Sequence, residues 1–104
     1  MKEKLIRQGD IMLVPGERPL GEPTKSKELT VALGEATGHH HTLYGDGQVS
    51  HWQDGARRFV EVDADYFLRH QEHHEHQIMP GVCYEILTEE EYDPFAEEMK
   101  KVVD

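Results

Sequence analysis

The eight histidines are the residues of this chain best suited to chemistry, and all of them lie between His39 and His76. The first cluster ends the segment 34–41, where His39 and His41 occupy alternate positions. The second cluster, residues 70–76, contains four histidines and two glutamates. Imidazole nitrogen is a common ligand of divalent transition metals. Two clusters from separated parts of the chain therefore predict a metal site to which both contribute ligands.

The first cluster has the spacing of a chelating pair. In an extended chain His39 and His41 would face one side and His40 the other. Residues two apart on one face of a strand lie about 6.5–7 Å apart at Cα, and two such rings can converge on an ion about 2.0–2.1 Å from each nitrogen. We therefore predict that His39 and His41 are metal ligands.

The second cluster offers ligands in either regular conformation. A strand would place His70, Glu72 and His74 on one side, whereas a helical turn would pair His70 with His73 and His74. Neither arrangement has the His-Glu-x-x-His spacing of zincin proteases. We predict metal ligands at His70, His73 and His74. Glu72 is the predicted catalytic carboxylate, as a ligand or as a base beside the ligands, with Glu35 as the alternative.

The ligand types fit zinc first, with nickel, iron or manganese as alternatives. Three protein ligands would leave a position open for hydrolysis or, with iron, for oxygen chemistry, whereas four would make a structural site. The sequence thus leaves open whether the protein is an enzyme. The competing hypothesis is a non-enzymatic bacterial or phage accessory protein that acts through protein contacts, with the histidines on its surface.

The amino-acid composition indicates which kinds of partner and which cellular location to expect. The 104 residues, expected to form a single β-rich domain over 1–104, carry 21 acidic and 11 basic side chains, a formal net charge of −10. That charge repels phosphate and argues against nucleic-acid binding. No apolar run approaches the roughly 18 residues of a membrane span, and the polar N-terminus predicts a cytoplasmic protein. The single cysteine, Cys83, cannot form an internal disulfide and is expected to be buried.

Turn-forming residues recur about every 8–12 positions, which is typical of all-β proteins. We predict a small sandwich or barrel, with a short C-terminal helix at 94–102 or an ordered tail. Gly45-Asp46-Gly47 is expected to be a hairpin turn, and residues 17–27 a surface loop. Exposed strand edges in so small a sheet favour a homo-oligomer. Strands are expected at 8–14, 28–33, 39–44, 49–53, 58–62, 66–70 and 82–87.

Over most of its length the chain resembles a group of small uncharacterised bacterial and phage proteins. The resemblance rests on Gln8-Gly9-Asp10, on Gly-Glu-x-Thr-Gly-His-x-His over 34–41, on the His/Glu-rich segment, on Pro80-Gly81 with Tyr84, and on Glu-Tyr-x-Pro over 91–94. It implies no established activity. A second resemblance, to cupins, rests on His39-x-His41 and Pro80-Gly81 and implies a metal-holding β-barrel.

Overall fold

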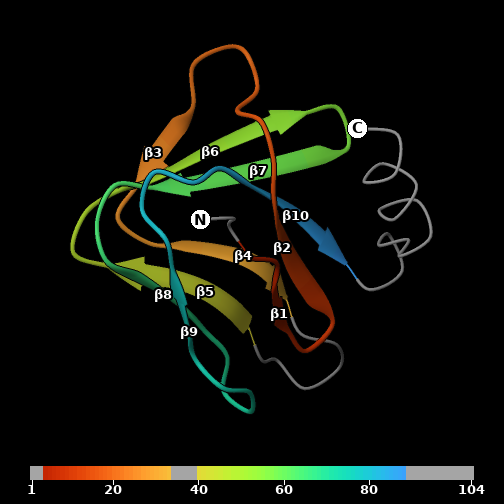
Figure 1. Cartoon of the computed structure of the whole chain (residues 1–104), viewed down its shortest axis with the longest axis vertical. Helices are drawn as coiled ribbons and strands as arrows, with labels where there is room; N and C mark the ends of the chain where they lie inside the picture. The colour runs from red at the N-terminus through yellow and green to blue at the C-terminus, as the bar shows by residue number, and fades with distance from the viewer. Residues whose placement is uncertain (1–3, 34–39, 89–104) are drawn as a thin grey trace.

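The computed structural model describes residues 4–33 and 40–88, which form ten strands in two antiparallel sheets (Figure 1). The sheets have the strand orders β1-β2-β10-β7-β6-β3 and β4-β5-β8-β9. The strands are β1 Ile6–Gln8, β2 Ile11–Pro15, β3 Thr24–Ser26, β4 Leu29–Leu33, β5 His40–Gly45, β6 Val49–Asp54, β7 Arg57–Val62, β8 Tyr66–Arg69, β9 His76–Ile78 and β10 Tyr84–Thr88. The predicted all-β class is confirmed. Within these described ranges, no helix is long and apolar enough to cross a membrane.

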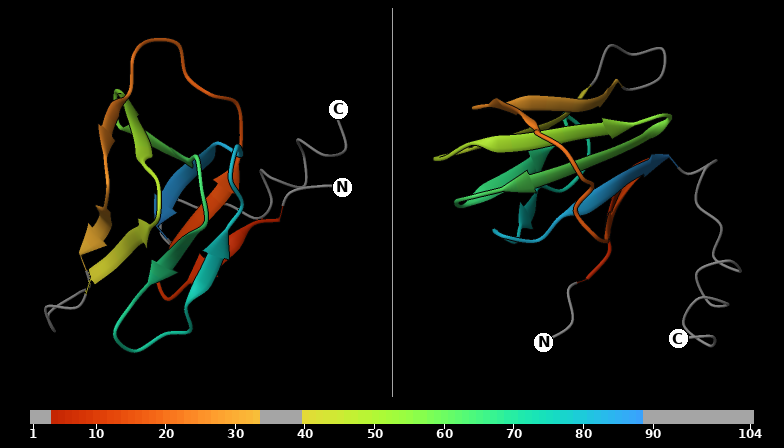
Figure 2. Two further views of the ribbon diagram at one scale, coloured as in Figure 1. Left: turned by 90° about the vertical axis from the view of Figure 1, so that its left-hand side faces the viewer. Right: turned by 90° about the horizontal axis from the view of Figure 1, so that it is seen from above.

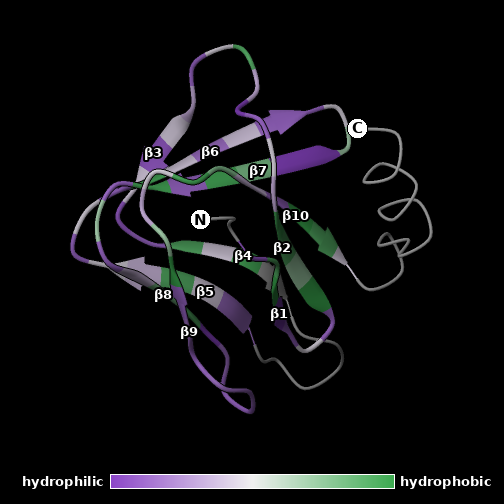
Figure 3. Cartoon of the chain, viewed as in Figure 1, coloured by the Kyte–Doolittle hydropathy of each residue, from purple (hydrophilic) through white to green (hydrophobic). Residues whose placement is uncertain are grey.

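One apolar core lies between the two sheets, and strands β2, β7, β8 and β10 contribute alternate residues to it. In Figure 1 strands β6 and β7 lie above β4, β5 and β8, and in Figure 3 apolar segments recur along β2, β4, β7 and β10. The core includes Leu13 of β2, Leu43 of β5 and Leu68 of β8, all fully buried. Burying one leucine side chain stabilises the fold by about 1.5–3 kcal/mol, so this layer is a main source of the free energy of folding.

A smaller apolar cluster of three buried side chains lies apart from this core and consists of Trp52, Phe59 and Cys83. The loop between β2 and β3, which arches away from the sheets in Figure 2, contacts Trp52 through two of its residues. The Arg18 guanidinium lies 5.9 Å from the centre of the Trp52 ring. The indole N–H of Trp52 donates to the Gly21 carbonyl at 3.2 Å. The predicted burial of Cys83 is confirmed.

The predicted hairpin at residues 45–47 is wrong. Strand β5 pairs with β4 and β8, whereas β6 pairs with β3 and β7, so residues 46–48 connect the two sheets instead. The connection is tied to the chain after β7, because the Gln48 N–H donates to Oδ1 of Asp63 at 2.7 Å. A glycine-rich turn can be recognised in a sequence, but the partners of the strands on either side of it cannot.

The structure adds three short strands, β1, β3 and β9, to the predicted set. Strand β3 lies within residues 17–27, which the sequence predicts to be a loop, and it pairs with β6 at the edge of its sheet. Three residues are too few for alternation to indicate a strand. The predicted helix at 94–102 lies outside the described residues.

Gly45→Ala should destabilise the protein by about 1–3 kcal/mol, because added volume at a closely packed position forces its neighbours apart. A Cβ at position 45 would lie 2.6 Å from ring carbons of the fully buried Tyr66. Gly16→Ala is the matched control, since the nearest atom to its Cβ would be 3.9 Å away. Urea unfolding followed by Trp52 fluorescence measures both, and equal stabilities would contradict the close approach.

Candidate functional site

Three segments that are far apart in the sequence meet around His41: the β1–β2 turn, the start of β5, and the loop from β8 to β9. Antiparallel pairing places Thr42 of β5 opposite Arg69 of β8, so that the residues next outward, His41 and His70, are neighbours. Their ring centres are 4.4 Å apart, and the His73 ring lies 4.6 Å from that of His70. His41 of the first cluster therefore lies beside His70 and His73 of the second.

The side-chain amide of Gln8 determines which nitrogen of His41 carries the ring proton. Both side chains are buried. Nε2 of Gln8 donates to the carbonyls of Leu68 at 2.9 Å and of His74 at 2.7 Å, so both of its hydrogens are used. Its oxygen, 2.9 Å from Nδ1 of His41, must then be the acceptor. In the neutral ring the lone pair of His41 is consequently on Nε2.

Nε2 of His41 faces a carboxylate. Oδ1 of Asp10 lies 3.1 Å away, on a side chain that is 42% exposed. Burial lowers the pKa of His41 below its ordinary value, an effect that Asp10 opposes and that His70 and His73 reinforce. The neutral ring thus presents a lone pair to a negatively charged oxygen. Such a pair needs a cation between the two atoms, either a proton or a metal ion.

The glycine between Gln8 and Asp10 is required for this geometry. Gly9 has a φ of +59°, in the left-handed region that disfavours side chains. A Cβ there would also lie 2.8 Å from Nε2 of His73 and 3.3 Å from Cε1 of His41. One tight turn therefore places Gln8 against one nitrogen of the His41 ring and Asp10 against the other.

The spacing of the acceptor pair fits two ligands of one ion. Ligand atoms about 2.0–2.1 Å from a tetrahedral ion lie about 3.3 Å apart, close to the observed 3.1 Å between His41 and Asp10. Among the described residues, no three His, Cys, Asp or Glu side chains are positioned to hold one ion together. His73 is the candidate for a third ligand, because its ring is exposed and can rotate toward the pair.

Three other predicted residues, His70, Glu72 and His74, contact the cluster in ways that the sequence did not indicate. Nδ1 of His70 accepts the backbone N–H of Glu72 at 3.0 Å, so the neutral His70 ring carries its proton on Nε2. The Glu72 side chain is exposed. His74 contributes its carbonyl to Gln8, while its side chain is exposed. Outside the described residues lie His39 and Glu35.

The sequence analysis missed Gln8 and Asp10 as site residues and used them only to mark the start of a strand and to support a family resemblance. The available indication was a pair of polar residues around a glycine, immediately before the apolar strand β2. Nothing local shows that this turn lies against His41, because the contact joins segments far apart in the chain.

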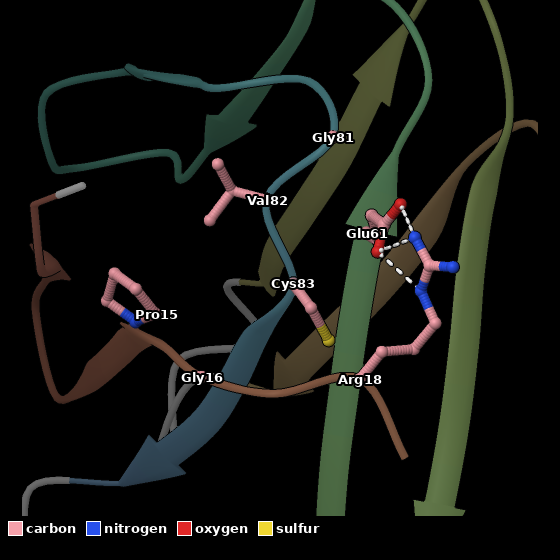
Figure 4. A pocket seen from close by; sticks show the side chains of 7 residues that line it. All are labelled: Pro15, Gly16, Arg18, Glu61, Gly81, Val82 and Cys83. Carbon is pink, nitrogen blue, oxygen red and sulfur yellow. Dashed lines mark hydrogen bonds and ion pairs between the residues drawn. The ribbon is translucent and has the colours of Figure 1, made fainter. Parts of the chain in front are cut away.

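A separate cavity of about 390 Å³ lies beside the smaller apolar cluster (Figure 4). Arg18 and Glu61 form an ion pair in its wall, with Nη2 2.6 Å from Oε2. Burial raises the pKa of Cys83 to about 11, so the thiol in this wall is not activated. The cavity is lined by Pro15, Gly16, Arg18, Glu61, Gly81, Val82 and Cys83.

The fold and the site define a small all-β protein of two antiparallel sheets, with the side chains of Gln8, His41 and Asp10 arranged in series beside a histidine-rich loop. Over residues 7–89 the chain matches the family described as a domain of unknown function, DUF8820, and it belongs to that family. The matched range includes the whole site. No curated protein and no solved structure matches the chain.

In metal-free protein at neutral pH, His41 should carry its ring proton on Nδ1, because Gln8 offers an acceptor there. Two-bond correlation of ring protons with ring nitrogen shifts identifies the protonated nitrogen. Gln8→Leu should move the proton to Nε2 and lower the free energy of unfolding by about 1–3 kcal/mol for each buried group left unpaired. Gln77→Leu, at an exposed position of β9, is the control. A wild-type proton on Nε2 would contradict the assigned role of Gln8.

Cys83 should react slowly with thiol reagents in the folded protein. A pKa of about 11, against an ordinary value of 9.0, lowers the thiolate fraction at pH 8 by about 100-fold. Because the folded pKa is raised, the stability from the buried thiol is present below pH 9 and lost as pH rises toward about 11. Cys83→Ala should remove that alkaline loss. The same reaction rate in native and urea-unfolded protein at pH 8 would refute this.

Proposed function

We propose that this chain binds one divalent transition-metal ion, zinc first, where His41 meets Asp10. His41 would supply Nε2 and Asp10 would supply Oδ1, with His73 as the third ligand. His39, outside the described residues, stays a predicted further ligand. Nickel, iron and manganese would suit the same donor types.

The observation that carries this proposal is the opposed pair of acceptors, Nε2 of His41 and Oδ1 of Asp10, 3.1 Å apart. Gln8 supports the proposal because it keeps the proton of the neutral ring on the other nitrogen. A histidine that ligates a metal through one nitrogen commonly donates its other N–H to an oxygen, which orients the ring and raises its basicity. The partial exposure of Asp10 would give the ion a path from solvent.

A protonated His41 is the alternative occupant of this gap. It would form an ion pair with Asp10 and would make the cluster purely structural. Burial, however, is the largest influence on the pKa of His41 and lowers it, so the charged ring is disfavoured. The nearby rings of His70 and His73 oppose a positive charge at the same place. A metal ion satisfies the carboxylate without requiring the ring to be charged.

The proposed third ligand, His73, is exposed, which favours an open catalytic site over a closed structural site. Three protein ligands would leave one position for water, as in hydrolytic zinc sites. The neutral His70 ring carries its proton on Nε2 beside His41, so it would be placed to donate a hydrogen bond near that position. A metal-dependent hydrolase is therefore the enzyme class that the arrangement supports best.

A second candidate function, a bacterial or phage accessory protein acting through protein contacts, is supported by one observation. Leu20 is 100% exposed between Pro19 and Gly21 in the β2–β3 loop. Burying such a side chain against a partner is favourable. A cytoplasmic location and self-association through strand edges belong to this proposal as much as to the first.

Zinc content tests the metal site. Protein purified without an affinity tag, incubated with zinc and desalted, should retain about one ion per chain. Asp10→Asn and His41→Ala should weaken zinc binding by at least about 10–100-fold, the range found even for residues that only support metal ligands.

Matched controls come from the same region. His40→Ala and the exposed Asp46→Asn should keep the ion, since His40 faces away from His41. Chelator should lower the midpoint temperature of the wild type but not that of Asp10→Asn. Zinc retained equally by Asp10→Asn would contradict the site, and a zinc-free wild type insensitive to chelator would favour the accessory protein.

A further inference from the structure

Two polar side chains, His51 and Arg58, lie on the core-facing surface of the six-stranded sheet, next to the apolar core residues. On β6, Val49 belongs to the core, and His51 follows it on the same face. On β7, Val60 belongs to the core, and Arg58 precedes it on the same face. Because His51 pairs with Val60, His51 and Arg58 are diagonal neighbours, about 7–8 Å apart at Cα. Both are half-buried.

Arg58 has no acidic partner in the described part of the chain. Its Nη1 donates to the Val31 carbonyl at 2.6 Å, and no carboxylate there pairs with it. Arg18 and Arg57 differ, because each forms an ion pair with a glutamate. The chain has 21 acidic side chains, yet the half-buried guanidinium of Arg58 faces inward without one. Burial of an unpaired charge is unfavourable, so a bound anion would stabilise Arg58.

His51 has an unused hydrogen-bonding atom at the same place. Its Nε2 is buried and has no hydrogen-bond partner among the described residues. Burial lowers the pKa of His51, and the Arg58 cation lowers it further, so the ring is neutral at neutral pH. A buried ring nitrogen without a partner is unfavourable and is rare in native proteins.

We propose that Arg58 and His51 bind the carboxylate of a small organic acid. The planar guanidinium would hold the carboxylate through N–H groups that Val31 does not use, and Nε2–H of His51 would donate to the same group. Val31 is followed by Ala32, which pairs with His41. The bound carboxylate would thus lie at the same end of the sandwich as His41. The inference goes beyond the proposed metal site and does not require it.

The test uses acetate as the probe on metal-free protein. The chelator is removed by gel filtration first, because EDTA is itself a carboxylate. Ring-proton signals of His51 are followed at constant pH and ionic strength while sodium acetate replaces sodium chloride. The His51 signals should shift saturably. Arg58→Gln should raise the Kd for acetate by at least about tenfold, whereas Arg57→Gln, which alters the neighbouring outward-facing arginine, should leave it unchanged.

Several outcomes would overturn this inference. The inference would be wrong if the His51 signals did not shift with acetate, or if folded Arg58→Gln bound acetate with the wild-type Kd. Arg58 would then serve only as a hydrogen-bond donor to the Val31 carbonyl. A response to phosphate but not to acetate would refute the carboxylate assignment. If Arg58→Gln does not fold, Arg58→Lys keeps a donor for Val31 but loses the planar fork, so it should also weaken binding. Zinc affinity in the Arg58 variants should match the wild type, which keeps failure of this site distinct from failure of the metal site.

Discussion

The side-chain amide of Gln8 makes hydrogen bonds to three separate parts of the chain, and the arrangement around His41 depends on them. Two bonds go to the carbonyls of Leu68 and His74, and the third comes from the ring of His41. A buried amide with all of these partners is favourable, whereas the same amide with one partner missing would leave polar groups unpaired away from water. The positions of the loop and of the ring are therefore coupled through one residue.

Side-chain amides hold the loop between β8 and β9 in place, whereas backbone hydrogen bonds between strands hold most other parts of the fold. Strands β8 and β9 pair with one another, but residues 70–75 between them belong to no strand. Gln8 holds the His74 carbonyl, and Gln71 accepts the backbone N–H of His40 at 2.9 Å. The loop is thus attached to both β1 and β5. Rings on such a loop can be held near a buried histidine while part of the loop stays open to solvent.

The all-β class and most strands could be predicted, because apolar residues at alternate positions, as in the sequence of β4, and turn-forming residues between strands are local properties of a sequence. The proximity of His41 to His70 could be proposed only as a hypothesis, since it depends on the register between β5 and β8. The roles of Gln8 and Asp10 were not predictable, because polar residues at a tight turn are ordinary in any sequence. The error at 45–47 has the same origin: turns are encoded locally, whereas strand partners are chosen by the whole core.

The central proposal is that a neutral His41 directs the lone pair of Nε2 toward Asp10 and that a metal ion binds between these two side chains. Anomalous diffraction at the zinc absorption edge, from crystals grown with zinc, tests this directly. We expect a peak about 2.0–2.2 Å from both Nε2 of His41 and Oδ1 of Asp10, with the hydrogen bond between Gln8 and Nδ1 of His41 intact. A peak only at exposed histidines of the 70–76 loop, or His41 bonded to Asp10 through a proton with no ion present, would contradict it.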